Sequence, residues 1–276
     1  MKFWKLHGIG NDFIAIDGRL DEIHPSEYSK LAKKVCHRRF SVGADGLLIV
    51  KNSDKADVEM MYYNSDGSRG EMCGNGLRCF AKFIYDNNIN KNKEISVETL
   101  DGIKNVELHI KEDEIEKVKV NMGKGSFETS KIPVNTKHKE FINETIKVLD
   151  KEFVVSSMLM GVPHTVVFLD KEDDIDIQKY GSAIENHKVF PNNTNVNFVK
   201  IIDTENIIVN TWERGCGYTL GCGTGMTASA VICNKLNKTG KSVNVISEGG
   251  NVKIDIEDSI YMTGNAVKIC EGTLEV

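Results

Sequence analysis

The sequence predicts an α/β (α+β) fold made of two pseudo-symmetric domains, and three observations support this prediction. Short runs rich in β-branched residues recur along the whole chain and are separated by Gly, Asn and Asp, as is typical of many strands. A cysteine–glycine motif occurs twice, each time after a β-rich run and before an apolar segment with helical periodicity. The length of 276 residues accommodates two domains of ordinary size.

The individual elements follow from local patterns. A helix is expected over residues 27–37, with Ser26 as its cap and its apolar residues on one face. Two further helices are expected directly after Cys73 and Cys222. The predicted strands share β-branched composition and lie at residues 57–64, 94–99, 106–110, 118–122, 154–157, 165–169, 195–202, 207–213, 243–247, 252–256 and 266–270.

The internal repeat sets the predicted domain limits. The motif Cys-Gly-Asn-Gly at Cys73 recurs as Cys-Gly-Thr-Gly at Cys222, and each copy has a polar residue nine positions earlier, Asn64 or Glu213. Glycines and a proline interrupt the strands between residues 122 and 133. We therefore expect a first domain over 1–125, completed by a C-terminal strand at 265–276, and a second over 126–264.

Composition limits the partners and the compartment. The formal net charge of −5 argues against binding to nucleic acid or to a membrane surface. The first residues lack the apolar region of a signal peptide, and no stretch approaches the roughly 20 apolar residues of a membrane span. The seven cysteines form no regular disulfide framework. The sequence therefore predicts a cytoplasmic protein with free thiols that acts on a small molecule.

A cysteine followed by glycines at a helix start has a specific chemical use. The first turn of a helix presents unpaired N–H groups and a positive potential, which bind a carboxylate and stabilise a thiolate. Two such sites, at Cys73 and Cys222, could serve opposite faces of one amino-acid Cα, where one thiolate removes the proton and one thiol returns it. We expect this inversion to need no cofactor. His164, Glu213 and Asp66 are candidates to set the protonation of the thiols.

Two alternative interpretations concern the cysteines. Either motif alone is more typical of a small buried cysteine, and only the matching pair favours catalysis. The equal spacing of Cys73 to Cys79 and of Cys216 to Cys222 also allows a zinc or redox protein. That spacing is wider than the usual two to four intervening residues of a zinc site, so no metal is predicted. The remaining thiols lie in apolar patterns and are predicted to be core residues: Cys36, Cys233 and Cys270.

Further motifs are spread nearly from end to end of the chain. They are Lys-Leu-His-Gly-Ile-Gly-Asn-Asp-Phe at 5–13, Val-Gly-Ala-Asp-Gly-Leu-Leu at 42–48, Asn-Ser-Asp-Gly-Ser at 64–68, Met-Cys-Gly-Asn-Gly-Leu-Arg-Cys at 72–79, Gly-Val-Pro-His at 161–164, Glu-Asn-His at 185–187, Asn-Val-Asn-Phe at 195–198, and Glu-Arg-Gly at 213–215 before Cys-Gly-Thr-Gly at 222–225. With these motifs the chain resembles the diaminopimelate epimerase family, which is independent of pyridoxal phosphate and serves the biosynthesis of lysine and of peptidoglycan precursors.

The resemblance implies a fold and a site. It implies two similar domains, each a curved mixed sheet around a central helix, with an active site in the cleft between them, and it implies a homodimer. The implied acid/base cysteines are Cys73 and Cys222, assisted by His164 and Glu213. The implied substrate-binding residues are Asn11, Asn64, Gly74, Asn75, Asn195, Glu213, Arg214, Gly223 and Thr224.

One position departs from the family pattern and leaves the substrate open. The family has an asparagine before the Pro-His pair that helps to hold the far end of the substrate, whereas this chain has Val162. A valine side chain neither donates nor accepts a hydrogen bond. The first hypothesis is therefore epimerisation of LL- to meso-diaminopimelate. The alternative is racemisation of another amino acid, a basic one or histidine, by the same two thiols.

Overall fold

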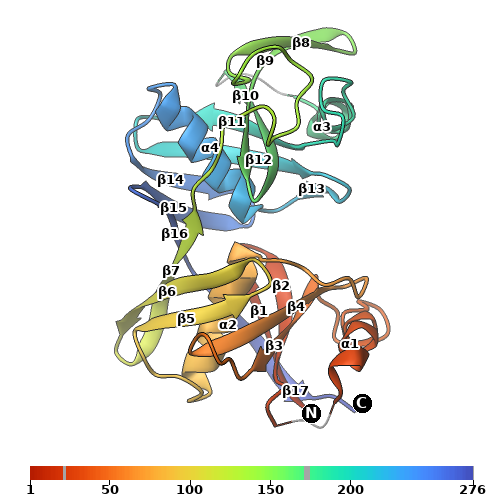
Figure 1. The fold of residues 1–276 in the computed structure, drawn as a ribbon, viewed down its shortest axis with the longest axis vertical. Coiled ribbons are helices and arrows are strands. Elements are labelled where there is room, and N and C mark those ends of the chain that lie inside the picture. Colours follow the sequence, from red (N-terminus) through yellow and green to blue (C-terminus); the bar gives the residue numbers. More distant parts are fainter. Residues whose placement is uncertain (21–22, 171–174, 276) are drawn as a thin grey trace. The chain divides into compact units, whose positions relative to one another are not determined.

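The computed structural model describes residues 1–20, 23–170 and 175–275, which divide into two compact units (Figure 1). Unit 1 contains residues 1–121 and the C-terminal segment from residue 263, and unit 2 contains residues 122–262. Val276, the last residue of the predicted C-terminal strand, lies outside the described residues. That each unit is an independent domain with the limits given above stays a prediction.

Unit 1 is a mixed sheet in which the C-terminal strand pairs with the first strand of the chain. Its ladder runs β17–β1–β2–β3–β4–β5–β6–β7, and the neighbours are antiparallel except β2–β3 and β4–β5, which are parallel. The strands are β1 (Lys2–Gly8), β2 (Asn11–Asp17), β3 (Gly46–Lys51), β4 (Val58–Asn64), β5 (Glu94–Thr99), β6 (Gly102–Lys111), β7 (Glu114–Gly123) and β17 (Val267–Thr273).

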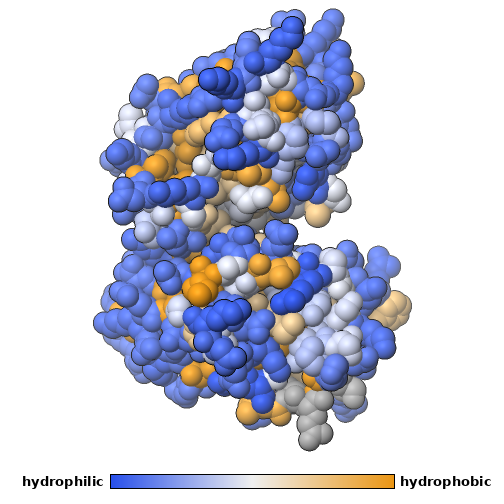
Figure 2. All heavy atoms as spheres, viewed as in Figure 1, coloured by the Kyte–Doolittle hydropathy of each residue, from blue (hydrophilic) through white to orange (hydrophobic). Residues whose placement is uncertain are grey.

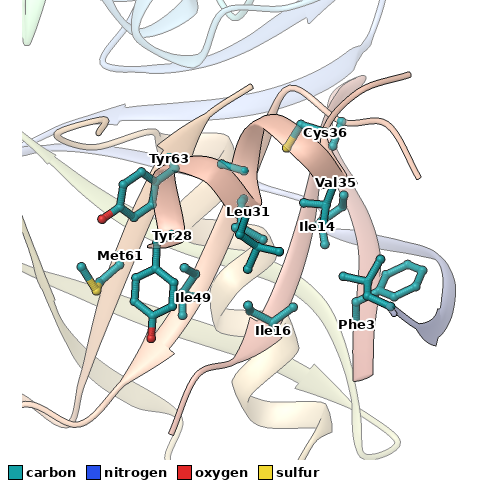
Figure 3. Packing of buried hydrophobic residues seen from close by; sticks show 14 residues of the cluster. Phe3, Ile14, Ile16, Tyr28, Leu31, Val35, Cys36, Ile49, Met61 and Tyr63 are labelled. Carbon is teal, nitrogen blue, oxygen red and sulfur yellow. The ribbon is translucent and has the colours of Figure 1, made fainter. Parts of the chain in front are cut away.

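Two helices pack on this sheet. Helix α2 (Gly74–Asp86) follows β4, and nearly all of its residues are buried, so it forms the centre of the unit. Helix α1 (Tyr28–Val35) covers a cluster of apolar side chains from β2, β3 and β4, which Figure 3 shows around Leu31. The prediction that Ser26 caps α1 is wrong. A short 3-10 helix (Pro25–Glu27) precedes α1, and Glu27 is the cap residue without a side-chain bond.

Unit 2 repeats the pairing pattern of unit 1. Its ladder β8–β9–β10–β11–β12–β14–β15 is antiparallel except for β10–β11 and β12–β14, and β13 adds to the end of β12. The elements are β8 (Glu144–Val148), β9 (Lys151–Met160), β10 (Val162–Leu169), α3 (Ile177–Glu185), β11 (Asn195–Ile201), β12 (Asn206–Glu213), β13 (Gly217–Thr219), α4 (Gly223–Lys235), β14 (Ser242–Ser247), β15 (Gly250–Ile256) and β16 (Ile260–Gly264).

The predicted α/β fold with a central helix in each repeat is therefore confirmed. In each unit, two antiparallel strands lead to a helix, a parallel strand, its antiparallel partner and the buried helix that begins after the cysteine. Hydrophilic residues cover most of the visible face of each unit (Figure 2). Cys36 and Cys233 are buried as predicted, but the prediction for Cys270 is wrong: it is exposed, because most residues of β17 lie at the surface.

Several elements have no counterpart among the predicted ones. Strand β3 has the sequence Gly-Leu-Leu-Ile-Val-Lys and is buried on both faces, between α1 and α2. A strand covered on both sides shows no alternation of apolar and polar residues, so period-two analysis does not detect it. The other elements that sequence analysis missed are β1, β2, β8, α3, β13, β16 and the 3-10 helix Pro25–Glu27.

Candidate active site

In unit 1, Cys73 lies at the N-terminus of the central helix. It is the N-cap residue of α2, with an extended backbone (φ −136°, ψ 118°), and its Sγ accepts a hydrogen bond from the amide of Gly76 at 3.5 Å. Gly74 and Asn75, the first two residues of the helix, are buried. The thiol therefore lies among the unpaired N–H groups of the first turn, which stabilise negative charge.

The carboxamide of Asn11 contacts this thiol. Its Oδ1 accepts from Cys73 Sγ at 3.5 Å and from Asn75 Nδ2 at 3.3 Å, while its Nδ2 donates to Asp45 Oδ2 at 2.7 Å. Because a carboxylate only accepts, Asp45 fixes which end of the Asn11 amide faces the cysteine. Sequence analysis gave no role to Asp45, since 34 positions separate it from Asn11.

A cluster of charged side chains surrounds Asp45, the hydrogen-bond partner of Asn11. Arg38 donates to Asp12 at 2.7 and 3.1 Å and to Asp45 at 2.7 Å, and Lys5 pairs with Asp12 at 3.1 Å. Burial raises the pKa of Asp12, but the hydrogen bonds and charges of Arg38 and Lys5 outweigh it and lower the pKa below its usual value. Asp12 is therefore ionised at neutral pH and anchors the start of β2.

Arg78 is a fully buried guanidinium inside the first turns of α2. It donates to the Oδ1 of Asn75 at 2.9 Å, to the carbonyl of Gly74 at 3.3 Å and to the carbonyl of Asn265 at 3.2 Å. A side chain at position 8 would overlap the Arg78 guanidinium, so Gly8 gives the guanidinium room. Arg78 thus holds the Asn75 amide that contacts Asn11.

Asn64 ends β4 in the same unit. It accepts a hydrogen bond from the hydroxyl of Tyr62 at 2.5 Å and donates to Ser68 at 2.9 Å. Asp66, considered in the sequence as a partner of a thiol, accepts instead from Ser68, whose hydrogen bonds lower the pKa of Asp66. Asp66 therefore shapes the turn after β4.

In unit 2, Cys222 occupies the same place as Cys73 in unit 1. It is the N-cap residue of α4, with a similar extended backbone (φ −103°, ψ 112°), and its Sγ lies 3.4 Å from the hydroxyl of Thr224. Cys222 and Gly223 are buried, and Thr224 is half-buried. The repeat in sequence therefore corresponds to a repeat in structure, with one thiol at the head of each central helix.

Three polar residues expected in the site meet at the end of β12. The Oδ1 of Asn195 accepts from the backbone amide of Arg214 at 2.9 Å, and the carboxylate of Glu213 accepts from the hydroxyl of Thr219 at 2.7 Å. The Arg214 guanidinium, on the exposed turn, donates to the carbonyl of Asn192 at 3.0 Å. These bonds fix the backbone of the turn that carries Glu213 and Arg214.

Glu185 holds the same turn from inside the unit. Its buried carboxylate accepts from the indole of Trp212 at 2.6 Å, from the amide of Gly215 at 3.0 Å and from Asn193 at 3.3 Å. The resemblance included Glu185 in a motif but gave it no role. No local pattern marked Glu185, because its burial and its bonds to Trp212 and Gly215 depend on the tertiary structure.

His164 is completely buried on β10. Its Nδ1 lies 3.3 Å from Asn197 Nδ2, and its Nε2 has no hydrogen-bond partner among the described residues. Burial, together with the nearby charge of Arg214, lowers the pKa of His164 to about 3. The imidazole is therefore neutral at physiological pH.

This burial predicts a pH dependence of stability. In the folded protein the pKa of His164 lies below the ordinary value near 6.5. Below that pH, His164 is therefore protonated in the unfolded chain but stays neutral in the folded protein. Stability is then lost as the pH falls, with a contribution of at most about 1.4 kcal/mol per pH unit. Urea unfolding from pH 7 to 4.5 should show a smaller loss in His164→Gln than in wild type. Parallel curves for the two proteins would contradict the prediction.

The two motif glycines differ in their surroundings, which gives a matched pair of variants. A Cβ at Gly225 would overlap Asn197 Oδ1, whereas a Cβ at Gly76 would meet the Phe13 ring at an ordinary 3.4 Å. We expect Gly225→Ala to lower the free energy of unfolding by roughly 2 kcal/mol. Gly76→Ala should change it by less than about 1 kcal/mol. Denaturant unfolding of both variants checks this, and equal losses would show that the overlap relaxes freely.

The structure gives no support to the zinc alternative. Within the part of the chain that the structure describes, no group of three or more His, Cys, Asp or Glu side chains could hold a metal ion. Cys79 is buried and its pKa is raised by burial to about 12, while Cys216 is exposed.

Among the described residues, no helix has the length and apolar character needed to cross a membrane.

The predicted residues thus gather into two groups, one in each unit. Cys73, Asn11 and Asn75 are connected in unit 1 by the hydrogen bonds given above. The Asn64 side chain lies in this unit with its own partners. In unit 2, Cys222 contacts Thr224 and Asn195 bonds the amide of Arg214, whereas Glu213 bonds Thr219 and His164 faces Asn197.

Solved structures define the class of fold. The chain is similar to a Bacillus anthracis phenazine biosynthesis protein of the PhzF family, with a TM-score of 0.73 and 15% identity over 100% of this chain and 99% of that one. It is similar to a probable proline racemase from Agrobacterium radiobacter K84, with a TM-score of 0.73 and 14% identity over 100% and 93%. The chain therefore has the fold that PhzF proteins and proline racemases share.

Sequence relatives identify the family. The family model described as diaminopimelate epimerase matches residues 3–128 and 156–269. A diaminopimelate epimerase of Alkaliphilus metalliredigens is 49% identical over 99% of this chain and 96% of its own length, and that of Clostridium perfringens is 47% identical over 99% of each. The chain belongs to the diaminopimelate epimerase family of isomerases, which confirms the resemblance noted in the sequence.

Proposed function

We propose that this protein interconverts LL- and meso-diaminopimelate by proton transfer between one Cα of the substrate and two cysteines, Cys73 and Cys222. One observation carries the proposal. In a chain nearly half identical to a diaminopimelate epimerase, both cysteines occupy the N-cap of the buried central helix of duplicated units. A site built twice in this way supplies one acid/base group for each face of a carbon atom.

The two thiols alone account for both protons that the reaction takes up and releases. One sulfur, as thiolate, takes the Cα proton and becomes a thiol, while the other thiol gives its proton to the opposite face and becomes a thiolate. The N–H groups of the helix starts, at Gly74 and Asn75 and at Gly223 and Thr224, would bind the substrate carboxylate and stabilise its growing charge. The chemistry requires neither a redox step nor an electron-sink cofactor.

The other polar residues suit the remaining parts of the substrate. Diaminopimelate carries a second carboxylate and ammonium, which an arginine can clasp and which asparagine amides can pair. Arg214, Asn195 and Asn64 are the groups that we assign to this end, together with the carboxylate of Glu213. His164 and Glu213 are assigned to assist the two thiols.

Val162 is the residue that favours an alternative substrate. This residue begins β10 and is 37% exposed, so it presents an apolar surface where the family pattern has an amide. An apolar contact at that place would suit an amino acid whose far end lacks one polar group. The alternative function is therefore racemisation of another amino acid, a basic one or histidine, by the same thiols.

Solvent exchange at Cα tests activity and substrate together. The purified protein is incubated in deuterated water with LL- or meso-diaminopimelate, and with L-lysine, L-arginine, L-ornithine and L-histidine separately, and the mass increase is measured. We expect a gain of one deuterium with inversion for diaminopimelate only. Exchange confined to another amino acid would select the alternative, and no exchange with any of them would reject both.

We further propose that the protein acts in the cytoplasm as a homodimer. The seven cysteines form no disulfide among the described residues, which suits a reducing compartment. Strand β17 pairs with β1 and exposes Val267 and Ile269, so it offers an apolar surface for a second copy. Sedimentation equilibrium should give twice the chain mass, and a monomer at micromolar concentration would remove the dimer from the proposal.

A further inference from the structure

Unit 2 contains a buried cluster of polar side chains beside the start of α4. The amide of Asn197, on β11, faces His164 on β10 and Thr211 on β12, and all three residues are buried. Asn197 also abuts Gly225, since any side chain at position 225 would overlap its Oδ1. The cluster therefore connects the imidazole to the first turn of the helix that Cys222 caps.

Unit 1 shows that the fold itself does not need this cluster. The two units share their ladder, with Gly46 of β3 in the place of Asn195 of β11. By this register, the positions that match His164, Asn197 and Thr211 hold Phe13, Leu48 and Tyr62. Burying polar groups costs free energy where apolar side chains could pack instead. The polar cluster of unit 2 therefore points to a functional requirement.

The hydrogen bonds of Asn197 determine the tautomer of His164. The Nδ2 of Asn197 faces the carbonyl oxygen of Thr165 at 3.4 Å, which can only accept, and its Oδ1 accepts from Thr211 at 3.0 Å. The same Nδ2 faces His164 Nδ1 at 3.3 Å, so Nδ1 must be the acceptor. A neutral imidazole then carries its proton on Nε2.

This tautomer leaves a donor for which the described residues of unit 2 supply no acceptor. The Nε2 atom of His164 is buried and has no hydrogen-bond partner among the described residues. A buried N–H without an acceptor is costly, and it is found where a ligand or a reacting group completes it. An anionic group in the loaded site, a thiolate or a carboxylate, would accept this hydrogen bond most strongly.

We propose that Asn197 is a positioning residue that holds His164 as the neutral Nε2–H tautomer, so that His164 serves the reaction as a hydrogen-bond donor to an anionic group and not as a base. The second half of this statement rests on the proposed epimerase function, whereas the first half concerns unit 2 alone. The lowered pKa of His164 agrees with it, because a neutral imidazole can donate only one hydrogen bond from the ring nitrogens.

Nitrogen NMR of the wild-type protein tests the tautomer without any assay of activity. The histidines are labelled with ¹⁵N, and the ring signals of His164 are assigned by their absence in His164→Gln. At pH 7 we expect a protonated Nε2 and an unprotonated Nδ1. A proton on Nδ1, or on both nitrogens, would overturn the proposal even if the chain epimerises diaminopimelate.

Two variants test the role of Asn197. Asn197→Leu copies Leu48 of unit 1 and removes the donor, so both tautomers should appear and kcat should fall roughly tenfold with a smaller change in KM. Thr211→Val loses another hydrogen bond of the same cluster and should keep the Nε2–H tautomer. An unchanged tautomer in Asn197→Leu, or its loss in Thr211→Val, overturns the assignment to Asn197. A lost tautomer with unchanged kcat overturns the donor role.

Discussion

Replacement of either helix-cap cysteine by alanine should abolish epimerisation. Cys73→Ala and Cys222→Ala each remove one of two acid/base groups that must act on opposite faces of the carbon. We expect kcat for inversion of LL- or meso-diaminopimelate to fall by about 10³-fold or more. Both cysteines are N-cap residues, and alanine leaves the backbone free to keep its extended conformation, so the fold should survive. Stereoselective chromatography of the product measures the effect.

A third cysteine provides the control. Cys270 is exposed on β17 and has no part in the proposed site, so Cys270→Ala should keep wild-type kcat. Cysteine-to-serine variants at 73 or 222 add a partial reaction, since one remaining thiol could still remove a proton from its own face of a substrate that carries a leaving group. Full inversion by either alanine variant would refute the two-thiol scheme.

Arg78→Met should cause the largest loss of stability among the variants described. Methionine fills much of the space of arginine but leaves the carbonyls of Gly74 and Asn265 and the amide oxygen of Asn75 without the charged donor. Losing hydrogen bonds from a buried charged group should lower the free energy of unfolding by about 3 kcal/mol or more. Urea unfolding at pH 7 measures the change.

Arg19→Met is the matched control for this variant. Arg19 pairs with Asp17 near the surface at 2.8 Å, and its side chain is 26% exposed. Partly exposed ion pairs contribute little, so the loss should stay within about 1 kcal/mol. Equal losses in the free energy of unfolding for both variants would contradict the stabilising role given to the buried hydrogen bonds of Arg78.

The sequence was most informative for features that depend only on residues close together in the chain. A cysteine followed by glycines specifies a helix start, and its recurrence at Cys222 predicted the duplicated unit that the ladders show. Strands rich in β-branched residues, such as β5 with Ile95, Val97 and Thr99, followed from local composition. The wrong prediction for Ser26 also had a local cause, because Pro25 begins a separate 3-10 helix just before α1.

Other features could not be read from local order, because they depend on residues far apart in the chain. The amide of Asn11 is oriented by Asp45, and Arg78 reaches Asn265 across 187 positions. Strand β3 was missed because burial on both faces removes the polar alternation that marks a strand. Such contacts follow from strand pairing and from the burial it produces.

By itself, the sequence determined the family, the α/β class of the fold and the residues at the heads of the two central helices. Only the tertiary structure decided how those residues are held and in which protonation state. The amide of Asn197 and the burial of β10 make His164 a neutral donor, although nothing next to it in the chain predicts this. The physical reason is that desolvation and hydrogen-bond geometry are properties of packed strands, whereas a motif specifies only which groups are available.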